Sequence, residues 1–244
     1  MARNETARNE TAGKAFKTEP APTGRELAVA RSLDSARTRA EGRVQRFLDA
    51  GFELLNESAS GKDFTVQDVV ERSGQSLRSF YQYFGGKHEL LLVLFEESVR
   101  ATADHLRNTS AQVADPLERL HLFVTEYYRL CRPVRGGKAR KSPTPVMMEF
   151  AQQLLTSHPA EASRAFVPLA SLFAEILDEA TERGVVRADL RRDLITGFVL
   201  EAIMFNAFSS TIGGSPPRGE SADGSEELWE FIFMGIGFGG IGKA

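Results

Sequence analysis

The chain has 244 residues, of which 42% are hydrophobic and 26% are charged, and its formal net charge is -3. This length and apolar content are enough for two folded domains and exclude a wholly disordered protein. The near-average charge identifies no acidic or basic partner and does not exclude DNA binding. Cys131 is the only cysteine, which excludes an intramolecular disulfide framework and a cysteine-based zinc site.

The sequence predicts a cytoplasmic protein that does not insert into a membrane. Its first residues lack the apolar core of a signal peptide, and no run of about 18 apolar residues occurs. The nearest candidate, Phe231 to Ile241, is too short and too rich in glycine. A single cysteine also fits a reducing compartment.

Residues 1–36 contain few large apolar side chains, and the unit Ala2 to Thr6 is repeated at Ala7 to Thr11. Such a segment cannot bury enough surface to offset the cost of ordering the chain, so we expect a disordered extension. The interspersed acidic residues favour a solvated tail. The alternative is a basic arm that enters a DNA minor groove, with the nearest candidates at Arg31, Arg37 and Arg39.

A helical pattern begins at residue 37. Apolar residues at spacings of three and four predict a first amphipathic helix, with its stripe at Val44, Phe47, Leu48, Phe52 and Leu55. Serine, alanine and glycine dilute this pattern around residues 57–61, where the helix should end.

Two further short helices are expected within the next 25 or so residues. Thr65 can cap the start of the second helix while Asp68, three residues on, returns a hydrogen bond. Gly74 suits the left-handed backbone at the end of that helix, and Ser76 can cap a third helix at residues 77–84. Two short helices joined around a glycine are typical of a helix-turn-helix.

Helical periodicity resumes after Gly85-Gly86-Lys87 and recurs in segments up to Phe238, with loop-like connectors at 132–145 and 213–224. We expect a long helix at 87–108 and later helical segments at about 116–131, 146–158, 160–183, 189–212 and 226–238. No strand-like alternation lies between them, so the predicted fold class is all-α. We place a helix-turn-helix domain at residues 37–86 and a second helical domain at 87–244.

Residues 65–90 resemble the DNA-binding domain of the TetR family of repressors. The matching residues are, in order, Thr65, Asp68-Val69, Gly74, Ser76, Phe80-Tyr81-Gln82-Tyr83-Phe84, Lys87 and Leu90-Leu91. The resemblance extends over about residues 45–110 and implies a dimeric DNA-binding regulator. Valine is commoner in the family at the position of Gln75, and a small residue at that of Arg78, so the resemblance does not imply which DNA sequence is bound.

The third predicted helix supplies most of the candidate DNA contacts. Phe80 and Phe84 lie four residues apart and should face the core. Arg78 can donate two hydrogen bonds to guanine and Gln82 can pair with adenine, so these two are predicted to set specificity. The full predicted set is Thr65, Gln75, Ser76, Arg78, Ser79, Tyr81, Gln82, Tyr83 and Lys87, the last binding a phosphate at the start of the next helix.

Two alternatives stand beside this interpretation. The segment can instead be an ordinary packing helix with no DNA partner. Tyr83 can be partly buried in place of touching a phosphate.

The last two helical segments are apolar on more than one face, which is more than one small domain can cover. TetR-like proteins dimerise through their last two long helices, so the resemblance implies a homodimer that binds a palindromic operator. The predicted interface residues are Phe198, Ile203, Phe205, Trp229, Phe231 and Ile232. A deep monomeric core is the alternative.

Residues 115–183 correspond to the region in which proteins of the family usually hold an inducer. Aromatic rings, methionine and hydroxyl groups suit an apolar or amphipathic ligand, although side chains at helical spacing also suit a plain core. The candidate lining residues are Phe123, Tyr127, Tyr128, Met147, Phe150, Phe166 and Phe173. The basic segment 132–141 can attract an acidic ligand such as an acyl-CoA phosphate, or it can be a solvated loop.

The leading hypothesis is therefore a transcriptional repressor released from DNA by a small-molecule inducer. The alternative is a helix-turn-helix regulator without such an inducer, controlled by a protein partner. Activation in place of repression stays open. An enzyme is not predicted, because no nucleophile and base are evident, and a helical enzyme would need a cavity with converging titratable groups.

Neither a cofactor nor a metal ion is predicted. The glycines at 235–240 fit the letters of a dinucleotide-binding motif but lack a preceding strand and a following helix. The four histidines, His88, His105, His121 and His158, are scattered without the spacing of metal ligands.

Overall fold

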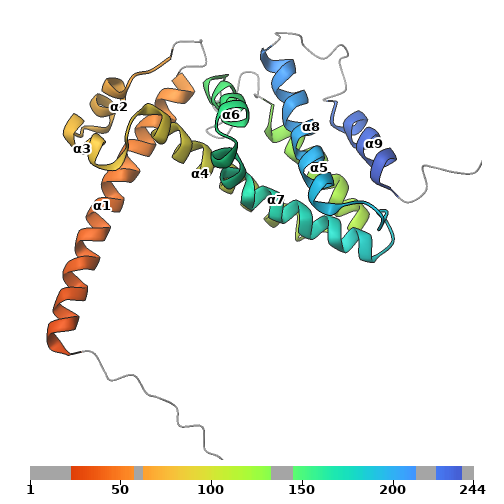
Figure 1. Cartoon of the computed structure of the whole chain (residues 1–244), viewed down its shortest axis with the longest axis horizontal. Helices are drawn as coiled ribbons and strands as arrows, with labels where there is room; N and C mark the ends of the chain where they lie inside the picture. Colours follow the sequence, from red (N-terminus) through yellow and green to blue (C-terminus); the bar gives the residue numbers. More distant parts are fainter. Residues whose placement is uncertain (1–22, 58–62, 133–144, 213–223, 238–244) are drawn as a thin grey trace, which may run out of the picture. The chain divides into compact units, whose positions relative to one another are not determined.

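The computed structural model describes residues 23–57, 63–132, 145–212 and 224–237 (Figure 1). These ranges contain nine α-helices: α1 (Gly24–Glu57), α2 (Val66–Ser73), α3 (Leu77–Tyr83), α4 (Lys87–Ser110), α5 (Pro116–Leu130), α6 (Pro145–Ser157), α7 (Pro159–Glu182), α8 (Arg192–Ile212) and α9 (Ser225–Ile236). Within them the only β-type pairing is one antiparallel bridge between Val186 and Gly237. The predicted all-α class is confirmed.

Residues 1–42 and residues 43–244 form two separate compact units. The described part of the first unit is the beginning of α1, and nearly all of its side chains are exposed. The expected disorder up to residue 36 is wrong for residues 24–36, which are helical. Alanine, leucine, arginine and glutamate are good helix formers and outweigh the lack of a buried face there. The repeated unit at residues 2–11 lies outside the described residues.

The second unit begins with three helices around a small aromatic core. The ring of Phe47 in α1 packs nearly perpendicular to the rings of Phe80 in α3 and Phe84. The centroid of Phe47 lies 5.4 Å from that of Phe80 and 6.0 Å from that of Phe84. Gly51 allows α1 to approach α4, because a Cβ atom there would lie 2.8 Å from Leu94. The predicted burial of Phe80 and Phe84 is confirmed.

The remaining helices surround a core that is continuous with this aromatic cluster. α4 packs along α7, α5 contacts α4, α7, α8 and α9, and α6 contacts α4, α7 and α8 (Figure 1). α4 therefore belongs both to the base of the helix-turn-helix and to the larger helical domain. None of the described helices is long and apolar enough to cross a membrane.

Candidate DNA-binding site

α2 has at both ends the caps that the sequence predicts. Thr65 Oγ1 accepts a hydrogen bond from the Asp68 backbone N–H, and the Thr65 N–H donates to Asp68 Oδ2 at 2.6 Å. Gly74 adopts φ 65° and ψ 22°, the left-handed conformation that favours glycine. The capping box fixes where α2 begins, and the turn glycine fixes where α2 ends and how the chain continues towards α3.

α3 presents polar side chains on the side away from Phe80. Ser76 caps its start by accepting from the Ser79 N–H at 3.1 Å. Arg78, Tyr81 and Gln82 are exposed. Because the phenylalanine face is anchored in the core, these three side chains stand on a rigid support, as a recognition helix requires.

A polar hollow of about 290 Å³ lies against the beginning of α3. Its lining residues come from α1, from the turn and from α3: Arg43, Gly74, Gln75, Ser76, Arg78, Ser79 and Gln82. Five of the nine predicted DNA-binding residues thus lie around one surface feature. Ser79 Oγ is buried there, and no partner for it is found within the described part of the chain.

Arg43 is a residue of this site that the sequence did not reveal. It is exposed and lies one residue before Val44, the start of the apolar stripe of α1. Only the packing of α1 beside α3 brings Arg43 to the hollow. An arginine on a neighbouring helix can contact phosphate while α3 contacts bases.

Three predicted contacts have other roles in this structure. The Thr65 hydroxyl donates to Asp68 Oδ2 at 2.7 Å, so it serves the cap. Tyr83 is half-buried and packs against the core, as one alternative expected. The Lys87 ammonium lies 2.5 Å from Asp63 Oδ1 and 4.5 Å from the ring centroid of Phe64. The ammonium that was predicted to bind a DNA phosphate is therefore already paired with a carboxylate.

The seven predicted ligand-pocket residues lie in the core of the helical domain. Six are buried and Phe166 is half-buried. They form two groups: Phe123 packs on Phe173 at 4.9 Å, whereas Phe150 and Phe166 both contact Phe95 of α4. Met147 and Tyr127 belong to the same continuous core.

The polar groups of Tyr127, Tyr128 and Cys131 inside this core have partners, whereas none is found for the buried Thr196 Oγ1 within the described residues. Tyr128 Oη donates to Asn206 Oδ1 of α8 at 3.2 Å. Burial raises the pKa of the Cys131 thiol to about 12, and a hydrogen bond with Tyr127 opposes this shift. Burial likewise raises the pKa of the Tyr127 hydroxyl. Both groups are therefore neutral at physiological pH, so this region suits an uncharged part of a ligand.

The six predicted dimer residues divide into three exposed, two buried and one half-buried side chain. Phe198, Phe205 and Phe231 are 61%, 55% and 74% exposed. Ile203 and Ile232 are buried inside the protomer's own core, because they lie on the opposite faces of α8 and α9. We therefore remove these two isoleucines from the predicted interface. Trp229 is half-buried, with its ring stacked on Phe233 and edge-on to His121.

Half of the glycine motif at 235–240 and nearly all of the basic segment at 132–141 lie outside the described residues. Gly237 is described and bonds to Phe233 through its backbone, at the end of α9. Residues 238–240 and 133–144 are not described.

An all-helical chain with a capped helix-turn-helix and a polar recognition helix has the architecture of a DNA-binding regulator. Residues 47–94 match the family model described as "Bacterial regulatory proteins, tetR family". The chain therefore carries a TetR-type DNA-binding domain, and the sequence resemblance is confirmed. No curated protein matches the chain at a significant level.

Solved structures with the same fold cover most of the chain. The fatty acid degradation regulator FadR from Bacillus halodurans is 17% identical, with a TM-score of 0.59 over 78% of this chain and 94% of its own. FadR from Thermus thermophilus, a TetR family repressor solved with lauroyl-CoA, is 21% identical, with a TM-score of 0.59 over 82% and 97%. FadR from Bacillus subtilis, solved with stearoyl-CoA, is 16% identical, with a TM-score of 0.58 over 81% and 99%. At these identities the likeness establishes the TetR-like fold.

Proposed function

We propose that this protein is a cytoplasmic, homodimeric transcriptional repressor that binds a palindromic operator through α3 and releases it when a small ligand binds the helical domain. The polar hollow carries the proposal: Arg78 and Gln82 border it from α3, and Arg43 borders it from α1. Each side chain has a distinct chemical task at DNA.

The arginine and the glutamine of α3 are suited to base recognition. Arg78 can donate two hydrogen bonds to the N7 and O6 atoms of guanine, and Gln82 can bond both edge groups of adenine. Each such pair contributes about 1–3 kcal/mol of discrimination against a wrong base. Arg43 is suited to phosphate, which adds affinity without sequence preference.

A DNA titration at several salt concentrations tests the DNA-binding role. The probe is DNA flanking the protein's own gene, with a random-sequence pool as the competitor. We expect Arg78→Ala to lower the ratio of specific to non-specific affinity by about tenfold or more. Arg43→Ala should weaken binding to both probes alike and reduce the slope of log affinity against log salt by about one.

The matched control is Arg183→Ala, which removes an exposed arginine from the end of α7. It should leave both affinities unchanged. Equal binding of the wild type to the flanking DNA and to the random pool would contradict the proposed sequence-specific regulator.

The proposed dimer buries the exposed phenylalanines of α8 and α9. Phe198 and Phe205 are seven residues apart, two turns of one helix face, and Phe231 is on the following helix. Exposed rings of this size cost solubility unless another surface covers them. A second copy covers them and also places two recognition helices on one duplex.

Sedimentation of the charged variants Phe198→Asp and Phe231→Asp tests this interface. We expect the wild type to sediment as a dimer and both variants as monomers with weakened operator binding. Val167→Asp, at an exposed valine of α7, is the control and should stay dimeric. Monomeric wild type at micromolar concentration would overturn the interface.

Ligand control is proposed to act through α4. This helix begins at Lys87, next to the helix-turn-helix, and packs against α5, α6 and α7. The proposal has α4 in two positions, one that binds DNA and one that does not. A ligand among these helices that binds the second position more tightly lowers DNA affinity by the ratio of its affinities for the two positions.

The first ligand class to test is a long-chain acyl-CoA, because the structures from Thermus thermophilus and Bacillus subtilis contain such molecules. Lauroyl-CoA, free CoA and laurate are titrated against the protein–DNA complex. Release of the DNA by lauroyl-CoA, but not by free CoA or laurate, supports the ligand-controlled repressor. Release by none of the three favours the regulator controlled by a protein partner.

A further inference from the structure

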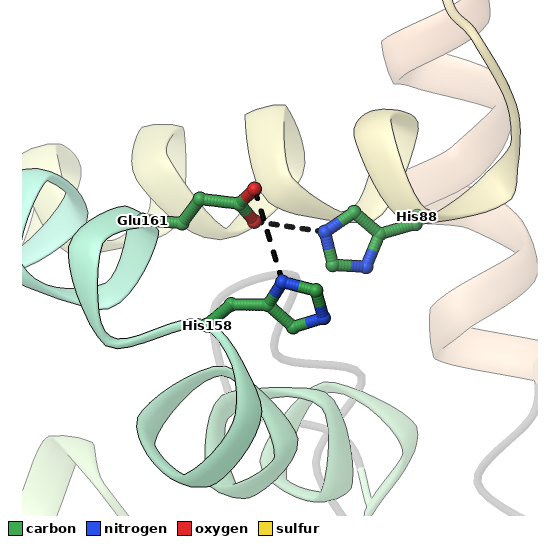
Figure 2. Close-up of side chains that lie close together, drawn as sticks. All are labelled: His88, His158 and Glu161. Atoms are coloured by element: carbon green, nitrogen blue, oxygen red, sulfur yellow. Dashed lines mark hydrogen bonds and ion pairs between the residues drawn. The ribbon is translucent and has the colours of Figure 1, made fainter.

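Three side chains that are distant in sequence converge beside the start of α4. His88 is the second residue of α4, His158 precedes α7, and Glu161 lies in the first turn of α7. Figure 2 shows the carboxylate facing both imidazole rings. His88 Nε2 is 2.8 Å from Glu161 Oε2, and His158 Nδ1 is 4.0 Å from Glu161 Oε1.

The spacing of these atoms suits a single metal ion. One ligand atom from each residue lies within 4.8 Å of the other two, and the two imidazole centroids are 4.7 Å apart. Ligands around a tetrahedral ion at about 2.0–2.1 Å lie roughly 3.3 Å from one another. Small rotations of the side chains therefore suffice to bring all three onto one ion.

The side chains are supported yet free to make this adjustment. The side chains of His88, His158 and Glu161 are 41%, 40% and 28% exposed, so an ion can reach them from solvent. The ring of His88 rests edge-on against Phe150 at 5.4 Å, which limits its orientation.

We propose that His88, His158 and Glu161 bind one divalent transition-metal ion of the zinc class, with water completing its coordination. Two neutral imidazole nitrogens and a carboxylate are ligands that such ions prefer. Binding needs no redox step: each nitrogen donates a lone pair, and an imidazole that was protonated releases its proton to solvent.

The position of the site gives the ion a regulatory consequence. His88 is adjacent to Lys87, whose ammonium pairs with Asp63 beside α2. A bound ion ties the first turn of α4 to the junction between α6 and α7. It therefore favours one position of α4 and changes DNA affinity, a step that rests on the proposed function.

Metal binding is measured first, without DNA, on the full chain free of any histidine tag. Metal-free protein is titrated with Co²⁺ and followed by its visible absorption, and Zn²⁺ is then added as competitor. We expect one Co²⁺ per chain, displaced by Zn²⁺. His88→Ala, His158→Ala and the near-isosteric Glu161→Gln should each weaken binding at least about tenfold, since even indirect partners of a metal contribute this much.

The matched control is His105→Ala. His105 is also on α4, is similarly exposed and pairs with Glu126 at 3.3 Å, but it does not belong to the cluster of three. It should bind Co²⁺ as the wild type does. Circular dichroism checks that every variant is folded. Absence of stoichiometric binding, or equal binding by the wild type and the His88→Ala, His158→Ala double variant, overturns the metal site.

Operator affinity is then compared with and without Zn²⁺. We expect a change of about 5- to 150-fold in the wild type and in His105→Ala, and none in Glu161→Gln. Stoichiometric metal binding with unchanged DNA affinity overturns the proposed effect of the metal on DNA binding, while the metal site itself stands. Metal binding by a protein with no specific DNA affinity overturns the proposed function, while the metal site itself stands.

Discussion

The ammonium of Lys87 and the carboxylate of Asp63 form an ion pair, with Nζ and Oδ1 2.5 Å apart. Asp63 lies three residues before α2, and Lys87 is the first residue of α4, so the pair joins the two ends of the helix-turn-helix segment. The lysine expected to bind a DNA phosphate thus has an acidic competitor on its own domain. Phosphate has to displace Asp63 or share the ammonium with it.

Replacing Asp63 by asparagine should tighten DNA binding. The change frees the Lys87 ammonium and removes a negative charge beside it. An exposed ion pair contributes about 0–1 kcal/mol, so affinity should rise by up to about fivefold at low salt. Fluorescence anisotropy with labelled operator DNA at two salt concentrations measures this change.

Asp104→Asn is the control, because it makes the same charge change at an exposed position of α4 about 25 Å further along the helix. It should have a much smaller effect. Weaker DNA binding by Asp63→Asn would show that the ion pair is needed to hold the domain in its binding conformation.

Gly74→Ala should destabilise the protein by about 1–2 kcal/mol, since its φ of 65° is unfavourable for a residue with a Cβ atom. The control, Gly42→Ala, changes a glycine inside α1 with no atom near the new methyl group. It should stabilise α1 by roughly 0.5–1 kcal/mol. Urea unfolding measures both, and a loss of stability in both variants alike would argue against the backbone explanation.

The helix-turn-helix was predictable from sequence because its determinants are local. Thr65, Asp68 and Gly74 act within one or two turns of the chain, and the spacing of Phe80 and Phe84 identifies the buried face of α3. Arg43 was missed because its role depends on how α1 packs beside α3, and no local pattern records that packing.

The histidine cluster shows the same limit over a longer distance. His88 and His158 are 70 residues apart, so no ligand spacing was visible and no metal site was predicted. The dimer prediction failed for Ile203 and Ile232 for a related reason. Both segments are apolar on several faces, and only the packed structure distinguishes the inner face from the outer one.

The Glu57–Arg72 pair predicts a dependence of stability on pH. Arg72 donates to both carboxylate oxygens of Glu57 at 2.8 Å, which lowers the pKa of Glu57 below its ordinary value of 4.5. The folded state therefore binds this proton less readily than the unfolded state does. The contribution is fully present above about pH 4.5 and is lost as the pH falls through the lower, folded-state pKa.

Urea unfolding of wild type and Glu57→Gln between about pH 3 and pH 7 tests this expectation. The wild type should be more stable than the variant near neutrality, and the difference should shrink on acidification. Glu182→Gln, at an exposed carboxylate at the end of α7, is the control and should show a smaller change. A difference that grows as the pH falls would contradict the assigned pair.

The buried thiol of Cys131 should resist alkylation in the folded protein. Its pKa is raised to about 12 by burial, so near pH 8 only about one molecule in 10⁴ carries the reactive thiolate. We expect iodoacetamide to react at least about a hundredfold more slowly with native protein than with protein in concentrated guanidinium, where the thiol returns to a pKa near 8.5. Mass spectrometry over a time course measures both rates.

Because Cys131 directly follows α5 and its thiol bonds with Tyr127, rapid native labelling would mean that this end of the helical core opens readily. A ligand that enters the core beside α5 should change the native labelling rate, whereas one that acts elsewhere should leave it unaltered.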